Sequence, residues 1–241
     1  MKDKLDDIDI KLILKCAEYS CDAYVDINNK KKNGFFIENK ETDTQSYLSV
    51  SDDTIIFSGQ GTTTLIDWTN NFRLWRKKIS YLENTLVHSG FIKSYDSIRH
   101  EIYSKIEEIR NMKKIKKIVC TGHSLFGAIA TIAALDFSIK YKDLLVECVT
   151  FGSPRVGSRN FAKLFNKNIN KSFRCVRLKD PIAFTPFPGR FKHVSGGIHL
   201  VKNDISLKVP LYNFCGCRIA HHSMDEYLEH IRTINLQSAK V

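Results

Sequence analysis

A short glycine-flanked segment is the part of this sequence best suited to nucleophilic chemistry. The segment 122–127 (GHSLFG) lies between the apolar run 118–120 and an alanine-rich run that begins at Leu125. A strand, a sharp turn and a helix in this order lift a serine hydroxyl clear of the backbone, where it can meet both a base and a substrate. Ser124 is therefore a candidate nucleophile, although a serine that only caps the helix would fit the same position.

Apolar spacing around this segment predicts alternating strands and helices. We expect strands at 35–37, 47–50, 54–57, 118–121, 146–151, 173–178 and 199–201, and helices at 7–24, 94–112, 125–140, 160–165 and 223–234. The first three strands favour an antiparallel start to a sheet, and the later alternation favours parallel pairing with helices on both faces. The fold class is therefore α/β, with a mainly parallel mixed sheet in a single domain spanning 1–241.

Composition and charge narrow the class of protein. With 43% hydrophobic and 26% charged residues in 241, the chain excludes collagen-like and disordered proteins. The 37 basic and 26 acidic residues give a net charge of +11, which favours anionic partners such as a membrane surface. Nucleic acid is not expected, because no recognition motif accompanies the charge.

Three further features concern the environment of the protein. The most apolar run, 125–139, is too short to span a bilayer and contains Asp136. The charged residues 1–7 do not form the apolar core of a secretion signal. The seven cysteines are odd in number and irregularly spaced, as is typical of reduced thiols. We therefore expect a soluble cytoplasmic protein; nothing in the sequence indicates its oligomeric state.

Several motifs in the expected order resemble those of the class 3, or fungal-type, lipases of the α/β-hydrolase superfamily. They are GHSL with Gly127-Ala128, VHSGF at 87–91, TFGSPRVG at 150–157, Asp180-Pro181, and His222 with Tyr227-Leu228. The resemblance extends from about Ala17 to about Leu228. It implies an α/β-hydrolase fold and cleavage of carboxylic esters of lipids, as in a triacylglycerol lipase or phospholipase. The reaction would proceed through an acyl-enzyme without a cofactor or a metal.

The resemblance also selects the partners of Ser124. The chain order in α/β-hydrolases is Ser, then Asp or Glu, then His. Asp180 follows the strand 173–178 and is the expected acid, with Asp204 as the alternative. His222 has the family's spacing to Tyr227-Leu228 and is the expected base, with His221 as the alternative. His123 is expected to point away from the nucleophile.

The loop 57–62 (FSGQGT) occupies the place of the family's oxyanion loop. Two backbone N–H groups are expected to form the oxyanion hole, those of Thr62 and Leu125. Leu65, Trp68, Phe72 and Trp75 then recur at helical spacing. This segment resembles the family's lid, although a helix packed on the core has the same pattern. Arg73 and the basic residues 76–78 beside these aromatic residues suit an anionic lipid surface.

Phe126 departs from the family pattern, which has glycine at this position next to the neighbouring strand. Its ring could tilt the helix, distort the turn or fill space left by smaller neighbours. An alternative function is therefore a catalytically weak or inactive lipase-like binding module. Zinc binding by Cys215, Cys217, His221 and His222 is not expected, because the spacing is unlike that of a structural zinc site.

Overall fold

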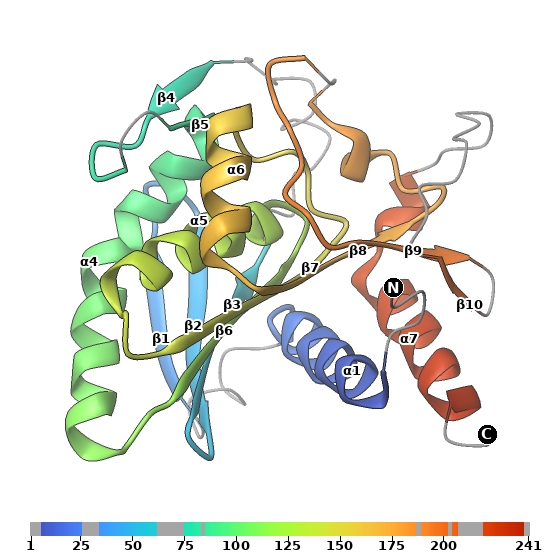
Figure 1. Ribbon diagram of the computed structural model, residues 1–241, viewed down its shortest axis with the longest axis horizontal. Helices are drawn as coiled ribbons and strands as arrows, with labels where there is room; N and C mark the ends of the chain where they lie inside the picture. The colour runs from blue at the N-terminus through green and yellow to red at the C-terminus, as the bar shows by residue number, and fades with distance from the viewer. Residues whose placement is uncertain are drawn as a thin grey trace.

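An eight-stranded mixed sheet forms the centre of the protein (Figure 1). The structure is a computed structural model, and it describes residues 6–25, 34–61, 75–82, 85–186, 189–201, 204–206 and 219–238. The strands of this sheet are β1 (Gly34–Asn39), β2 (Thr44–Ser51), β3 (Thr54–Gln60), β6 (Lys117–His123), β7 (Leu145–Phe151), β8 (Lys171–Arg177), β9 (Gly197–Val201) and β10 (Asp204–Ser206).

The order of the strands in the sheet is β1-β2-β3-β6-β7-β8-β9-β10. Strands β1, β2 and β3 are antiparallel, whereas β3, β6, β7, β8 and β9 are parallel, and β10 returns antiparallel to β9. The expected antiparallel start and mainly parallel sheet are therefore confirmed. Parallel pairing brings the carboxyl ends of β6, β7 and β8 to one edge, where sites on such sheets are built.

Helices cover both faces of the sheet. One face carries α1 (Asp7–Asp22) and α7 (Met224–Ser238), and the other carries α4 (Ser89–Met112), α5 (Ser124–Lys140) and α6 (Arg159–Asn168), as Figure 1 shows. Successive side chains of β3 point to opposite faces of the sheet, which explains this arrangement. Phe57 packs in the cluster under α4 and α5, while its neighbour Ile56 packs in the cluster under α1 and α7. The strand is thus buried on both faces.

Helix α5 is apolar on all sides, and its residues 124–137 are all buried. The one charged side chain among them, Asp136, is paired with Arg99 of α4 at 2.6 Å and accepts a hydrogen bond from Tyr95 at 2.7 Å. Burial of a charge is costly unless it is paired in this way. The pair joins the carboxyl-terminal half of α5 to α4.

A small antiparallel hairpin of β4 (Arg76–Lys78) and β5 (Leu86–His88) lies beside α6 at the top of Figure 1. Trp75, expected on the amphipathic helix, instead directly precedes β4. Two 3₁₀ turns are present: η1 (Ile182–Phe184) lies between β8 and β9, and η2 (Ile219–His222) precedes α7. No helix in the described part of the chain is both long and apolar enough to cross a membrane.

Candidate active site

The turn between β6 and α5 has the geometry of a nucleophile elbow. Ser124 has a φ of +58°, in the left-handed region that side chains other than glycine rarely adopt. Glycines on either side of Ser124 make this turn sterically possible. A Cβ on Gly122 would lie 2.7 Å from Phe126 Cδ1, and one on Gly127 would lie 2.8 Å from Ser153 Cβ. The strain at Ser124 is the feature that sets it apart from an ordinary capping serine.

Asp180 and His222 form a buried hydrogen-bonded pair. The Nδ1 atom of His222 lies 2.7 Å from Oδ2 of Asp180, and both side chains are at most 1% exposed. The same oxygen accepts a hydrogen bond from the Tyr227 hydroxyl at 2.7 Å, and the other carboxylate oxygen accepts from the Ile182 N–H at 2.8 Å. These three donors hold the carboxylate in place. With Nδ1 directed at Asp180, the Nε2 atom of His222 is left to act as a base.

Gly152 lets the main chain pass directly against this pair. It directly follows β7 and has a φ of +57°, and a Cβ at this position would lie 2.6 Å from Asp180 Oδ2 and 2.9 Å from the His222 ring. Only glycine fits both the backbone conformation and the space. The motif 150–157 therefore includes a residue that is needed at the site, a role that its position after a strand did not reveal.

The elbow lies against the histidine of the pair. The ring of His123, the residue before Ser124, stacks on the His222 ring with centroids 4.4 Å apart. The prediction that His123 points away from the nucleophile therefore overlooked its contact with the expected base. Among the described residues, Ser124 Oγ and His222 Nε2 are both buried without a hydrogen-bond partner. A hydrogen bond between them is thus not formed in this structure; catalytic hydrogen bonds in unliganded enzymes are often long.

A tyrosine just after the end of α1 connects the elbow to the end of β3. The Tyr24 hydroxyl lies 2.9 Å from His123 Nδ1 and accepts a hydrogen bond from the Gly61 N–H at 3.2 Å. Gly61 is close to the nucleophile as well, because a Cβ there would lie 3.3 Å from Ser124 Cβ. In the sequence, Tyr24 is only the last residue of the helix expected at 7–24, which ends at Asp22 in the structure. Its polar role depends on three segments that meet in space.

Burial determines which atom donates in this bridge. It raises the pKa of Tyr24 to about 12, so the hydroxyl keeps its proton at neutral pH. Burial, together with the nearby His222, lowers the pKa of His123 well below its usual range, so this imidazole is neutral. Tyr24 therefore donates to Nδ1 of His123. Burial, and to a lesser extent the charge of Asp180, likewise raises the pKa of Tyr227. Its hydroxyl therefore keeps its proton and donates.

The ring of Phe126 fills space left by small neighbours, one of the three outcomes considered for this residue. Phe126 is fully buried and packs against Phe57 with ring centroids 5.2 Å apart. A Cβ on Gly59 of β3 would lie only 2.1 Å from Phe126 Cε2. The glycine at 59 thus accommodates the ring, and the elbow keeps its strained conformation beside it.

Asp204 and His221 were the alternatives for the acid and the base. His221 lies 3.7 Å from Glu226 and is partly exposed, so it is His222 that faces Asp180. Asp204 starts the strand β10, where it is paired with Val201. Of the two expected oxyanion donors, Leu125 is in the first turn of α5, whose N–H groups have no partner within the helix.

Other predicted positions lie outside the described residues. They are Thr62, the lid candidates Leu65, Trp68 and Phe72, and the cysteines Cys215 and Cys217. In the described ranges, no group of three or more His, Cys, Asp or Glu side chains could hold a metal ion. The five described cysteines, at positions 16, 21, 120, 148 and 175, are all free thiols.

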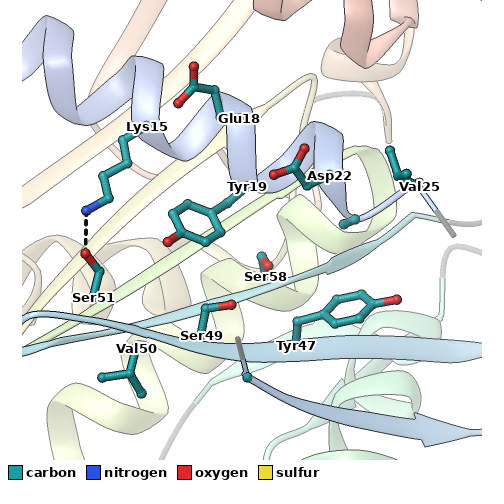
Figure 2. Close-up of a pocket in the computed structure, with 12 residues that line it drawn as sticks. Lys15, Glu18, Tyr19, Asp22, Val25, Tyr47, Ser49, Val50, Ser51 and Ser58 are labelled. Carbon is teal, nitrogen blue, oxygen red and sulfur yellow. Dashed lines mark hydrogen bonds between the residues drawn. The ribbon is translucent and has the colours of Figure 1, made fainter. Parts of the chain in front are cut away.

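A hollow of about 810 Å³ lies between α1 and the strands β1, β2 and β3. Figure 2 shows Tyr19, Asp22 and Tyr47 among its lining residues, together with a hydrogen bond from Lys15 to Ser51 of 3.0 Å. Neither Ser124, Asp180 nor His222 lines it. In spite of its size, this hollow is therefore not the candidate catalytic centre.

Comparisons with known proteins agree with this geometry. Residues 56–189, more than half of the chain, match the family model of class 3 lipases. A secreted mono- and diacylglycerol lipase of Fusarium solani is 28% identical over 142 residues, which cover 58% of this chain and 42% of the relative. A chloroplastic phospholipase A(1) of Arabidopsis thaliana is 33% identical over 152 residues, which cover 55% of this chain and 33% of the relative. This chain thus spans less than half the length of these two relatives.

Solved structures of fungal lipases share the fold. A mutant lipase from Penicillium cyclopium superposes with a TM-score of 0.78 at 19% identity and covers 91% of this chain and 96% of its own. A triacylglyceride lipase of Rhizomucor miehei superposes with a TM-score of 0.74 at 19% identity and covers 91% and 97%. The expected α/β-hydrolase fold is confirmed.

The expected cytoplasmic location is contradicted by these comparisons. The relatives from Fusarium solani, Malassezia restricta and Penicillium cyclopium are all named as secreted lipases. The prediction relied on the charge of residues 1–7 and on the number of cysteines. Neither feature determines where a folded domain acts.

Proposed function

Because the chain belongs to the class 3 lipase family, we propose that it hydrolyses carboxylic esters of lipids with Ser124, His222 and Asp180 as its catalytic triad. The observation that carries the proposal is the buried 2.7 Å pair of His222 and Asp180 beside a serine held at positive φ. Serine becomes a useful nucleophile only when a base and an orienting acid accompany it. The substrate class is that named for the relatives, mono- and diacylglycerols or phospholipids.

In the first half of the reaction, Ser124 Oγ attacks the ester carbonyl and gives its proton to His222 Nε2. Asp180 stabilises the imidazolium that forms. The tetrahedral intermediate collapses when the C–O bond to the alcohol breaks, and His222 returns the proton to the leaving alkoxide. The product of this half is an acyl group on Ser124. In the second half, water attacks the acyl carbonyl and gives a proton to His222 Nε2. The bond between the acyl carbon and Ser124 Oγ then breaks, His222 returns the proton to Oγ, and the carboxylic acid leaves.

The oxyanion of each intermediate needs donors close to Ser124. The Leu125 N–H is one candidate, at the start of α5 where the helix dipole also favours negative charge. The Gly61 N–H is already bonded to Tyr24, so it is not free to serve as the second donor. This supports Thr62, the next residue along the loop, for that role.

Contact with an anionic membrane surface is also part of the proposal, since the substrates would be lipids and the chain carries a net charge of +11. From the family resemblance, we also propose that the segment that contains Leu65, Trp68 and Phe72 acts as a lid. No cofactor or metal is required by the steps above.

The test is fatty-acid release from a panel of monoacylglycerol, diacylglycerol and phospholipid esters. Ser124→Ala is expected to lower turnover by about 10⁴- to 10⁶-fold, because the nucleophile is lost. Ser138→Ala, the same change farther along α5, removes only a bond to the Leu135 carbonyl and is expected to leave turnover unchanged. If the folded wild-type protein hydrolyses none of these esters, the alternative of an inactive binding module replaces the proposal.

A further inference from the structure

The positive charge of this protein is concentrated in one stretch of the chain. Residues 148–203 contain eleven Lys and Arg residues and a single acid, Asp180, which is buried in the proposed triad. Outside this stretch the chain is close to electrically neutral. Nearly all of the net charge therefore comes from residues 148–203, and the places of these residues in the fold decide what they can attract.

Part of this charge reaches the edge of the sheet where the proposed triad lies. Gly152 contacts Asp180 and His222, and four residues later the Val156 carbonyl accepts a hydrogen bond from the His88 N–H of β5. Gly157 then forms bridges to both Val87 and Lys192. The β4–β5 hairpin, the start of α6 and the loop 189–192 are thus joined at the edge that carries the site.

Five cations and an aromatic side chain gather on this joined surface, which we call the basic rim: Trp75, Arg76, Lys77 and Lys78 of the hairpin, Arg159 of α6, and Arg190. All six are exposed, Trp75 by 69%. Trp75, Arg76 and Arg190 line a shared hollow of about 410 Å³. The antiparallel bridge between Gly157 and Lys192 places Arg159 and Arg190 on the same side of that bridge.

The rim cations have no acidic partners within the described ranges. The ion pairs of the structure involve other residues, such as Arg99 with Asp136 and Lys116 with Asp53. The described hairpin residues 75–82 include no acid. An unpaired cluster of one sign carries a potential that attracts a surface of the opposite sign. An exposed tryptophan among such cations is typical of proteins that lie at a lipid interface.

We propose that the basic rim docks the protein on a bilayer rich in anionic phospholipid, with the triad edge directed at that surface. The inference rests on the proposed hydrolysis of lipid esters and specifies the kind of interface on which the substrate is met. The arginine and lysine head groups pair with lipid phosphates or carboxylates, and Trp75 enters the head-group region. An exposed tryptophan among cations also suits a single-stranded nucleic acid; a lipid surface is favoured because the rim is joined to the edge that carries the proposed lipid-ester chemistry.

The test measures binding without turnover, in full-length protein that carries Ser124→Ala. Sedimentation with phosphatidylcholine vesicles is compared with sedimentation with phosphatidylcholine vesicles that contain phosphatidylglycerol. We expect strong binding only to the anionic vesicles, weakened as salt is raised. The triple variant R76Q/K77Q/K78Q is expected to bind them on the order of 100-fold more weakly, because three favourable charges are removed.

A matched variant removes the same number of charges elsewhere. Lys113, Lys114 and Lys142 are exposed on the loops that precede β6 and β7, at the opposite edge of the sheet. K113Q/K114Q/K142Q is expected to bind anionic vesicles as the parent does. Thermal unfolding monitored by circular dichroism checks that both variants are folded. Should the hairpin variant not fold, R159Q/R190Q removes two rim charges from other elements and is expected to weaken binding in the same direction.

Three results would overturn the docking surface. They are equal binding of neutral and anionic vesicles, equal losses in the rim and control variants, or rim-dependent binding of an oligonucleotide without binding of vesicles. The fluorescence of Trp75 is a separate measurement of docking, because Trp68→Phe leaves Trp75 as the only tryptophan. Its emission is expected to shift to shorter wavelength with anionic vesicles. Wild-type turnover of a water-soluble ester reports on the proposed chemistry independently, so the two proposals can fail separately.

Discussion

The hydroxyl of Tyr24 joins three segments that are distant in the sequence. It accepts from the Gly61 N–H at the end of β3 and donates to His123 of the elbow, and His123 in turn stacks on His222. This bridge fixes the end of β3, from which the proposed oxyanion loop continues, relative to the nucleophile. Tyr24 is thus a positioning residue that need not touch the substrate.

Tyr24→Phe is expected to lower kcat by about 10- to 100-fold with a small effect on KM, because the oxyanion loop and His123 lose their common anchor. Steady-state kinetics on a soluble ester measures both parameters. Tyr19→Phe, within the preceding helix α1, is the matched control and should retain full activity. Equal kinetics for Tyr24→Phe and the wild type would show that the bridge has no positioning role.

Individual site residues were predictable to different degrees. Ser124, Asp180 and His222 each stand in a motif, and the structure places the acid and the histidine in contact. The roles of Tyr24 and of the Tyr227 hydroxyl were not predicted. A sequence pattern marks such residues as apolar core, because the partner of the hydroxyl comes from an element far away in the chain.

At the scale of elements, the Phe126 ring packs between a strand and a helix. The ring lies between β3 and the start of α5, where the glycine at 59 and the Phe57 ring form its surroundings. The residue that departs from the family pattern is therefore matched by space on the neighbouring strand. The same pairing keeps α5 close to the sheet.

Phe126→Ala is expected to lower the free energy of unfolding by about 3–5 kcal/mol, because it leaves a cavity that the rigid sheet does not close. Phe126→Leu, which keeps most of the volume, should cost clearly less. Urea unfolding measures both variants. A gain in stability or in turnover for Phe126→Ala would mean instead that the phenyl ring strains the elbow.

The bounds of helices and strands with a strong hydrophobic pattern were predicted closely. The bounds of those that depend on tertiary contacts were not. The helix expected at 125–140 is observed as Ser124–Lys140, because its sequence is apolar throughout. The helix expected at 94–112 starts earlier, at Ser89, because the His88 side chain accepts from the Gly90 N–H and caps it. The strand β4 was missed altogether. Its residues Arg76–Lys78 are all exposed, and it forms only by pairing with β5.

At the scale of the whole molecule, buried histidines make stability depend on pH. Burial, and then the charge of Arg174, lowers the pKa of His199 to about 4, and burial also lowers the pKa of His123 and of His193. An unfolded histidine takes up a proton near pH 6.5, whereas these folded ones do not. Protons therefore favour the unfolded chain as the pH falls below about 6.5.

The free energy of unfolding is accordingly expected to decrease between about pH 7 and about pH 5, with each such histidine contributing up to about 1.4 kcal/mol per pH unit. Urea unfolding at several pH values measures the slope. His199→Gln should make the slope shallower, since one titrating group is removed. A variant slope equal to that of the wild type would rule out His199 as a source of the pH dependence.

The central claim is that Ser124 is the nucleophile of a serine hydrolase, and an active-site-directed fluorophosphonate tests it most directly. Such a reagent forms a covalent bond only with a serine that a neighbouring base has activated. Mass spectrometry of the labelled peptides is expected to find the label on Ser124 in the wild type and none in Ser124→Ala, with labelling retained in Ser138→Ala. Equal labelling of the wild type and Ser124→Ala, or labelling at another serine, would contradict it.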